Sequence, residues 1–393
     1  MNGKRPISPL RTEVRVSETG LVRSRHYLPL TRREFGLGAA AAVGAAAVGL
    51  PGTNASAATG VNFMGWQGYD DGINVDNWLE KNGIELKPTY IGTNEEIIAA
   101  ASAGGVGTMD IATPAEIYLP VYRAAGILEP LDLDRIPNYA GIYPEIKDFM
   151  PIDEGNTVIG LPFVWGDVPL MYNAEVIQEP PDSWHALTDE RYKGRVGMVY
   201  DVMGIMVHSP LAATSTKTPT RITQEELDQT IAWLIKIKKE YARTVVPSYG
   251  ELAALFANGE VVIAPAWTPT AAWAGEDAPK LDWVIPKEGA LVFVDIFSMI
   301  RDAPHKDLNY KILNHTLSPE AQANTANLNL TAVTVEDAVP LLDELPRSLY
   351  HYEDIAGWFE KTGGPYPPWS TEQEGDFLNY DQILQGWERF LQA

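Results

Sequence analysis

The chain has 393 residues, roughly two to three times the size of a typical domain, so two lobes or domains with cores of their own are expected. Apolar residues make up 45% of the chain and charged residues 21%, which is typical of a folded globular protein. The net charge of −22 repels phosphate backbones, so no nucleic acid partner is expected. There is no cysteine, which excludes thiolate nucleophiles, zinc–thiolate sites, iron–sulfur clusters and disulfides.

Residues 1–57 have the composition of an export signal. Eight basic and three acidic residues make this segment positively charged, unlike the rest of the chain. Arg32 and Arg33 precede an uncharged run at 36–50 that is rich in Ala and Gly, and Ala55-Ser56-Ala57 follows. The run has 15 residues, fewer than the ~20 that a transmembrane helix needs. It is therefore interpreted as the apolar part of a cleavable signal.

Paired arginines before a weakly apolar run resemble the twin-arginine signal, which directs folded proteins across the inner membrane. The alternative is an ordinary basic signal for export of the unfolded chain. In both cases we expect cleavage near Ala57 and a mature chain in the periplasm. The first alternative makes the twin-arginine export machinery a partner.

The first part of the mature chain alternates strand and helix patterns. Strands are predicted at 61–64, 84–90 and 109–112. The helix between the first two carries Val75, Trp78 and Leu79 on one face and ends at Gly83. The next helix begins at Thr93 or Asn94 and runs through Ala103. This β-α-β-α-β pattern predicts α/β architecture with mainly parallel sheets.

A second α/β segment follows. Strands are predicted at 168–172, 196–200, 261–266 and 291–294, and a short helix at 250–258. Thr223 and Glu226 have the spacing of a capping box and open a longer helix. The apolar face of that helix consists of Leu227, Ile231, Leu234 and Ile235. Another helix is expected to begin at Ser318-Pro319.

No catalytic motif is present. Gly-x-Ser-x-Gly, His-Glu-x-x-His, the Walker loop and Gly-x-Gly-x-x-Gly are all missing. Five histidines follow the signal, and no two have metal-ligand spacing. No cofactor or metal is predicted. A pair of carboxylates at glycosidase distance stays open, because the chain has many acidic residues.

Aromatic and acidic residues stand where strands are predicted to end. Trp66, Trp165 and Trp267 each follow a predicted strand, as do Asp201 and Asp295. In open α/β sheets ligands bind at the carboxyl ends of strands, where an indole attracts a cation and a carboxylate binds an ammonium group. Core packing of the tryptophans and helix capping by the aspartates are the alternatives.

The chain resembles the spermidine/putrescine-binding family of ABC-transporter substrate-binding proteins from Val61 to about Ala338. The motifs that carry the resemblance are Gly65-Trp66-Gln67-Gly68-Tyr69, Thr93-Asn94-Glu95-Glu96, Leu128-Glu129-Pro130-Leu131-Asp132, Leu161-Pro162-Phe163-Val164-Trp165-Gly166, Tyr192-Lys193-Gly194, Asn258-Gly259-Glu260, Ile285-Pro286-Lys287-Glu288-Gly289 and Leu317-Ser318-Pro319-Glu320.

The resemblance implies a two-lobed periplasmic binding protein fold of type II, in which a ligand cleft lies between two α/β lobes. Residues 58–166 would begin lobe 1, 167–293 would form lobe 2, 294–338 would return to lobe 1, and 339–393 would form C-terminal helices on lobe 2. Strands crossing near 165–166 and 293–295 would form the hinge. The mature protein is expected to be a monomer that passes its ligand to an inner-membrane ABC permease.

The resemblance also implies a binding site for a small organic cation, a polyamine such as putrescine or spermidine or a related amine. Each lobe would supply aromatic walls, and carboxylates would bind the amines. The implied site residues are Trp66, Gln67, Tyr69, Asp201, Ser248, Trp267, Phe293 and Asp295. Asp167 stands where the family has a small hydroxyl residue and is expected to add a charge.

Four positions depart from the family pattern. An acidic residue is replaced by Gly204, a small polar residue by Ala115, and tyrosines by Ile117 and Leu330. A cation smaller than spermidine, or a ligand with its own carboxylate, is therefore also open. The alternatives to a polyamine transporter component are a secreted carboxylate-pair hydrolase acting on carbohydrate, a binding protein for another solute, and one that serves a sensor.

Overall fold

The computed structural model describes residues 11–16, 22–27, 58–150, 153, 155–214 and 216–393. Strands β1 (Arg11–Val16) and β2 (Val22–Tyr27) pair antiparallel in a unit of their own. Arg32, Arg33, the apolar run and the cleavage site near Ala57 lie outside the described residues. Residues 58–393 form the second compact unit.

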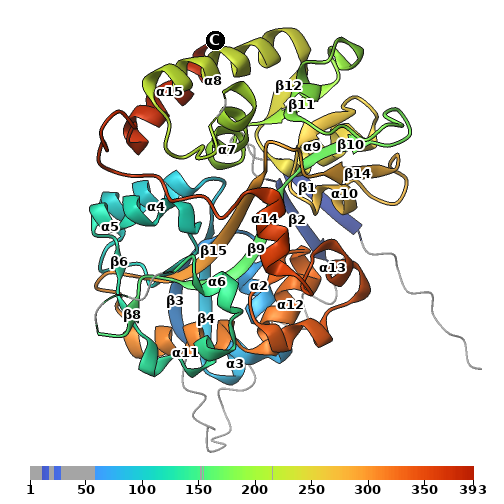
Figure 1. The fold of residues 1–393 in the computed structure, drawn as a ribbon. Coiled ribbons are helices and arrows are strands. Elements are labelled where there is room, and N and C mark those ends of the chain that lie inside the picture. Colours follow the sequence, from blue (N-terminus) through green and yellow to red (C-terminus); the bar gives the residue numbers. More distant parts are fainter. Residues whose placement is uncertain (1–10, 17–21, 28–57, 151–152, 154, 215) are drawn as a thin grey trace, which may run out of the picture. The chain divides into compact units, whose positions relative to one another are not determined.

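A seven-stranded sheet organises one half of this unit, which we call lobe 1 (Figure 1). Its strand order is β16-β9-β15-β5-β3-β4, and β6 also pairs with β15. The strands are β3 (Thr59–Gly65), β4 (Ile84–Tyr90), β5 (Ile111–Ala112), β6 (Leu128–Glu129), β9 (Leu161–Val168), β15 (Leu291–Ile300) and β16 (Ala332–Val333). A small separate pair joins β7 (Leu131–Asp132) to β8 (Thr157–Val158).

A five-stranded sheet organises the other half, lobe 2, in the order β12-β11-β13-β10-β14. The strands are β10 (Leu170–Asn173), β11 (Val196–Val199), β12 (Ala242–Val246), β13 (Ile263–Pro265) and β14 (Leu281–Val284). Only Pro169 separates β9 from β10, and β14 leads back into β15. The long strands β9 and β15 therefore connect the lobes (Figure 1).

Helices surround both sheets. Those that precede or follow strands of lobe 1 are α2 (Tyr69–Ile73), α3 (Trp78–Lys81), α4 (Asn94–Ala100), α5 (Leu119–Ala125), α6 (Pro144–Lys147), α11 (Lys306–Thr316) and α12 (Pro319–Asn329). Lobe 2 has α7 (Val202–Ala213), α8 (Gln224–Lys236), α9 (Tyr249–Ala257) and α10 (Thr270–Trp273). The last helices are α13 (Glu344–Leu349), α14 (Ile355–Thr362) and α15 (Tyr380–Gln392).

Shorter helical turns complete the described elements. The 3-10 turns are Val75–Asn77, Glu116–Tyr118, Leu133–Arg135, Pro137–Gly141, Trp184–Thr188, Glu190–Tyr192 and Glu336–Leu341. Two π turns, Ala101–Gly105 and Ile237–Tyr241, extend α4 and α8 at their carboxyl ends.

The α/β class and the two-lobed fold are confirmed, but the prediction of mainly parallel sheets is wrong. Among the strands of the described residues, only β3 with β4 and β5, and β11 with β12 and β13, pair in parallel. β9 pairs antiparallel with β15, and β10 pairs antiparallel with β13 and β14. The chain leaves lobe 1 through β9 and returns through β15, so neighbouring connecting strands run in opposite directions.

Local signals predicted several elements well. Thr223 and Glu226 form the predicted capping box of α8, and Ser318 caps α12. Ile235, predicted as core, is only half-buried, since it lies at the border of the apolar face. The single helix predicted before Gly83 is broken. Asp76 and Asn77 have φ near +55°, so the short turn Val75–Asn77 ends there and α3 begins separately at Trp78.

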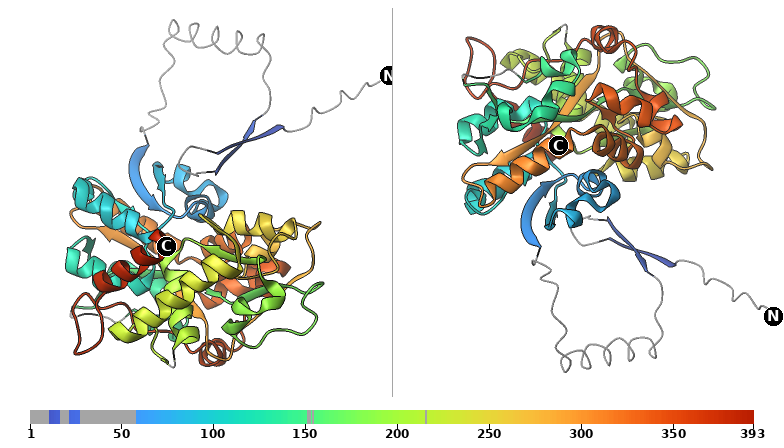
Figure 2. Two further views of the ribbon diagram at one scale, coloured as in Figure 1. Left: turned by 90° about the horizontal axis from the view of Figure 1, so that it is seen from above. Right: turned by 90° about the horizontal axis from the view of Figure 1, so that it is seen from below.

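The helices of the C-terminal residues 339–393 contact elements of both sheets' surroundings. α13 contacts α12 and β16, and α14 contacts β15. α15 lies beside α8, as Figures 1 and 2 also show. This segment thus follows the surface from lobe 1, past the connecting strands, to lobe 2.

Candidate ligand-binding site

Two adjoining compartments form the candidate cleft. The first, of about 250 Å³, includes Asp201, Glu95, Tyr118, Ser248 and Tyr249 in its lining and is called the Asp201 compartment. The second, of about 220 Å³, includes Asp295, Tyr69, Asp167, Phe293 and Tyr350 and is called the Asp295 compartment. Trp66, Ile91, Trp267 and Trp273 line both compartments, so the two adjoin along these side chains.

All nine predicted site residues line this cleft. Trp66 and Trp267 border both compartments. Asp201 and Ser248 line the Asp201 compartment only. The Asp295 compartment is lined by the other five, which are Gln67, Tyr69, Asp167, Phe293 and Asp295. Residues that lie far apart in the sequence, from Trp66 to Asp295, are thus brought together around two adjoining cavities. Their role in ligand binding stays a prediction.

Tryptophans separate and border the compartments. The rings of Trp66 and Trp267 meet edge to face with centroids 6.2 Å apart. Trp267 also stacks on Tyr249 at 4.5 Å and lies 5.6 Å from Phe293. Such faces provide apolar walls that attract a cation through the ring quadrupole.

Trp165 does not line either compartment. The prediction that it follows the end of a strand is wrong. β9 continues to Val168 and pairs with β15 on one side and β16 on the other. Trp165 is therefore fully buried, and its indole N–H donates to the carbonyl of Val333 at 2.9 Å. It packs in the core between the connecting strand and the C-terminal segment.

Asp295 lies within β15 and is 3% exposed, so the prediction that it follows the end of a strand is wrong, because β15 continues to Ile300. The Tyr69 hydroxyl donates to its Oδ2 at 2.6 Å, whereas its Oδ1 has no hydrogen-bond partner among the described residues. Burial raises the pKa of Asp295 to about 7, and the charge of Asp201 contributes in the same direction. A buried carboxylate with an unpartnered oxygen favours a cationic donor.

Asp201 follows β11 and is half-buried at the start of α7. The Tyr249 hydroxyl donates to its Oδ2 at 2.8 Å. Burial raises the pKa of Asp201, and the negative charge of Glu95 raises it further. A side chain at Gly204 would have its Cβ 2.4 Å from both Asp201 Oδ2 and Tyr249 Oη. The departure at Gly204 therefore leaves room for the Tyr249–Asp201 hydrogen bond.

Asp167 and Ser248 already have protein partners. Thr268 Oγ1 donates to Asp167 Oδ1, and the Trp358 indole N–H donates to Oδ2 at 3.0 Å. Burial raises the pKa of Asp167 to about 6. Ser248 Oγ accepts from the backbone N–H of Glu251 at 3.2 Å and caps α9. Asp167 thus joins β9, the loop before α10, and α14.

The charged side chains that line the cleft are all acidic. Its lining contains the carboxylates of Glu95, Asp167, Asp201 and Asp295, and no Lys, Arg or His lines either compartment. An anionic ligand would face uncompensated carboxylates there, whereas a cation would neutralise them.

Residues 75–347 match the family described as bacterial extracellular solute-binding protein. The chain belongs to this family. A putrescine-binding periplasmic protein of Escherichia coli, PotF, is 24% identical over 309 residues, covering 74% of this chain and 82% of the relative. A spermidine/putrescine ABC transporter structure from Listeria monocytogenes has TM-score 0.68 and 21% identity, covering 85% of this chain and 98% of that one.

The same fold also occurs with other ligands. The binding protein MotA of A. tumefaciens, solved with glucopine, has TM-score 0.60 and 19% identity and covers 77% of this chain and 92% of that chain. The predicted resemblance to the polyamine-binding family is confirmed. The chain is a solute-binding protein of the ABC-transporter type that acts outside the cytoplasm, and the hydrolase alternative is dropped.

Within the described residues, no three His, Asp or Glu side chains are grouped as a metal site. No helix in that part of the chain is long and apolar enough to cross a membrane.

Several cleft residues of this solute-binding protein were missed. Glu95 and Tyr249 lie in the first turns of α4 and α9, and neither was predicted as a site residue, although Glu95 belongs to a motif that carries the resemblance. Tyr350 comes from beyond the resemblance; its hydroxyl donates to the carbonyl of Leu330 at 2.9 Å. A tyrosine therefore still lines the Asp295 compartment, although Leu330 replaces the expected one. The mismatched Ala115 and Ile117 are buried and line neither compartment.

Glu116 was also missed and lies under the cleft. It is 3% exposed and accepts a hydrogen bond from the backbone N–H of Val294 at 2.7 Å. Burial raises the pKa of Glu116 to about 8, and the charge of Asp295 raises it too. Its neighbour Ala115 forms a β-bridge with Asp295, so this acidic group lies against the strand that carries Asp295.

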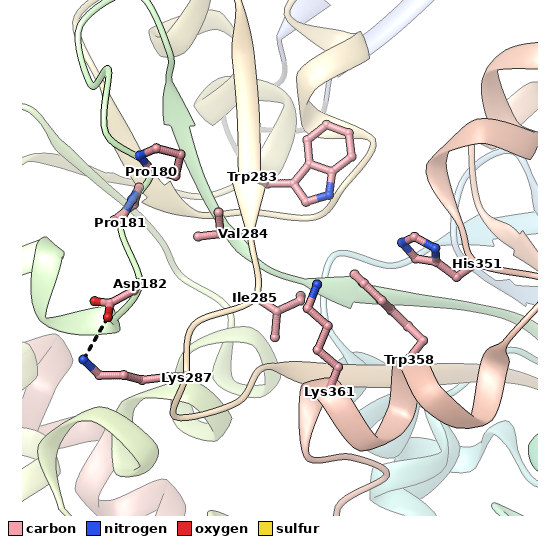
Figure 3. Close-up of a pocket in the computed structure, with 10 residues that line it drawn as sticks. All are labelled: Pro180, Pro181, Asp182, Trp283, Val284, Ile285, Lys287, His351, Trp358 and Lys361. Atoms are coloured by element: carbon pink, nitrogen blue, oxygen red, sulfur yellow. Dashed lines mark hydrogen bonds and ion pairs between the residues drawn. The ribbon is translucent and has the colours of Figure 1, made fainter.

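An outer groove of about 500 Å³ lies between β14, the loop at 180–182 that follows β10, and the segment around α14 (Figure 3). In it, His351 packs on Trp358 with centroids 4.2 Å apart, and Lys361 Nζ lies 5.0 Å from the Trp358 ring. Because the Trp358 N–H binds Asp167, the indole connects this groove to the Asp295 compartment.

Proposed function

We propose that this protein captures a small organic cation, a polyamine such as putrescine or spermidine or a related amine, and delivers it to an inner-membrane ABC permease. The observation that carries the proposal is the lining of the cleft, in which four carboxylates and three tryptophans occur without a basic residue. The relatives named for putrescine and spermidine support the same class of ligand.

The geometry suits an alkylammonium ligand. Asp295 offers an unpartnered, buried oxygen, and an ammonium group would complete its hydrogen bonding. Trp66 and Trp267 line both compartments, so an alkyl chain that reaches from Asp295 to Asp201 would pass along these indoles. An amino acid or opine carries its own carboxylate, which would lack a basic partner here.

A ligand screen tests this function. Wild-type protein is heated with amines, betaines, amino acids and sugars, because a ligand at 100 times its Kd adds about 2.7 kcal/mol of stability. We expect stabilisation by di- and polyamines, weakened by high salt because the bond is ionic. Stabilisation by sugars or amino acids alone would overturn the proposal. Co-purification with a permease, instead of a sensor protein, would support the transport role.

Export is proposed to use the twin-arginine route, with cleavage near Ala57 and release of a monomer. The proposal rests on the pairing of Arg32 and Arg33 before a weakly apolar run. Replacing both by lysine should leave precursor in the cytoplasm. Normal export of this variant would favour the unfolded-export route.

A further inference from the structure

Glu95 is a cleft carboxylate that comes from lobe 1. It lies in α4, is half-buried and lines the Asp201 compartment. The Tyr380 hydroxyl donates to its Oε1 at 2.5 Å. Tyr380 begins α15, the helix that lies beside α8 of lobe 2. The orientation of Glu95 is thus set by a residue 285 positions later in the chain.

Tyr380 is held in place by other rings. Its ring lies 5.6 Å from that of Tyr118 and 5.4 Å from that of Trp369, and the last two are 5.0 Å apart. The backbone N–H of Trp369 donates to the carbonyl of Ile117 at 3.1 Å. Tyr118 also lines the Asp201 compartment. This cluster fixes the tyrosine hydroxyl and therefore the carboxylate that it holds.

Glu95 and Asp201 reach the same cavity from different lobes. Neither has a basic ion-pair partner among the described residues, and no basic side chain lines the compartment. Their like charges repel, as the raised pKa of Asp201, caused first by burial and also by Glu95, indicates. A cation between them would remove the repulsion and add charge-assisted hydrogen bonds.

Resting on the proposed function, we propose that Glu95 is a ligand-binding carboxylate that forms, with Asp201, an ammonium site shared by the two lobes. Tyr380 is its positioning residue. The ligand class is then an alkyl diamine, with one ammonium group at this site and the other at Asp295. The site selects diamines over monoamines, because a monoamine can satisfy only one of the two ends.

Calorimetric titration with 1,4-diaminobutane and n-butylamine tests the assignment. Glu95→Gln keeps an acceptor for Tyr380 but removes the charge while Asp201 remains, so diamine affinity should fall roughly tenfold while butylamine affinity changes less than about threefold. Tyr380→Phe should lower diamine affinity by a smaller factor, again without weakening butylamine. Glu96→Gln is the matched control, because Glu96 is exposed on the same helix and lines neither compartment.

These outcomes distinguish a failure of the role proposed for Glu95 from a failure of the proposed amine-binding function. If the ratio of diamine affinity to butylamine affinity is the same in Glu95→Gln as in the wild type, the proposed role of Glu95 is wrong, even though both amines bind. Equal weakening of both amines with a lower melting temperature would also overturn it, since Glu95 would then act only as a structural acceptor. If wild-type protein binds neither amine, the proposed function itself fails.

Discussion

The Asp295 and Asp201 compartments share their tryptophans but hold their carboxylates differently. Asp295 is almost fully buried, with one oxygen bonded to Tyr69 and the other unpartnered. Asp201 is half-buried and shares its compartment with Glu95. Burial makes a charge costly and its neutralisation rewarding, so the first compartment is expected to determine affinity. The second compartment, with two carboxylates from different lobes, is expected to determine which cations fit.

Removing the charge of Asp295 should have the largest effect on affinity. Asp295→Asn keeps the shape but turns a charge-assisted hydrogen bond into a neutral one, so amine binding should weaken by about 1–3 kcal/mol, or tenfold to a hundredfold. Asp201→Asn should cost less, because Asp201 is less buried and Glu95 remains. Calorimetry at low and high salt measures both. Equal losses would contradict the contrast between the compartments, and salt-independent binding unchanged by Asp295→Asn would contradict a cationic ligand.

Trp267 belongs to both compartments, so its loss should affect any ligand that spans them. Trp267→Ala removes the indole beside Trp66, Tyr249 and Phe293, and binding should weaken by about 2 kcal/mol. Trp267→Phe keeps an aromatic face and should lose less. Thermal unfolding of the ligand-free variants separates a binding defect from a folding defect. Wild-type affinity in a stable Trp267→Ala protein would place this indole outside the binding surface.

Amine affinity should rise with pH through the range in which Asp295 ionises. Burial raises the pKa of Asp295 to about 7, whereas the amine stays protonated below about pH 9. Below pH 7 the carboxyl must lose a proton before it can bind the ammonium group, so affinity should fall by up to about tenfold per pH unit. Calorimetry at pH 8, 7, 6 and 5 measures this slope, and Asp295→Asn should flatten it.

The stability of the ligand-free protein should change in the opposite direction. A carboxyl whose folded-state pKa is raised contributes stability that is present below its unfolded pKa and lost as pH rises through the folded pKa. For Asp295 and Glu116 that loss extends to about pH 7 and about pH 8. The melting temperature without amine should therefore fall between pH 5 and 8, while the amine-induced increase grows. A pH-independent increase would contradict the proposed ionisation of Asp295.

The sequence predicted the cleft residues that follow strands, and it did so for a physical reason. Trp66, Asp201 and Trp267 come after strands whose carboxyl ends border the cleft, and ligands of α/β sheets bind at such ends. Trp165 was misassigned because β9 does not end there but continues into lobe 2. A strand that connects two lobes gives no local signal of where it ends.

Other features depend on tertiary packing that local patterns do not encode. Glu95, Tyr249 and Tyr350 reach the cleft from helix starts and from the C-terminal segment, so their proximity depends on how lobe 2 closes on lobe 1. α7 was missed for a different reason. It is apolar on all sides and buried, so it lacks the periodicity that marks an amphipathic helix.

The smallest expected effect on affinity concerns Asp167, whose two oxygens accept from Thr268 and Trp358. Trp358→Phe keeps a ring against His351 but removes the N–H, leaving a buried carboxylate oxygen without its donor. If Asp167 joins the lobes and does not contact ligand, amine affinity should change less than about threefold. The free energy of unfolding should nevertheless fall by about 1–2 kcal/mol at pH 8.

That loss of stability should itself depend on pH. Burial holds the pKa of Asp167 at about 6, and loss of a donor to the ionised form raises it further. The variant should therefore be destabilised more at pH 8 than at pH 5, where the carboxyl is protonated in both proteins. Trp283→Phe is the control, because Trp283 lines the same outer groove without a bond to Asp167 (Figure 3). A tenfold loss of amine affinity in a stable Trp358→Phe protein would instead indicate that Asp167 contacts the ligand. The Asp295 compartment would then bind its ammonium group between two carboxylates, as is proposed for the Asp201 compartment.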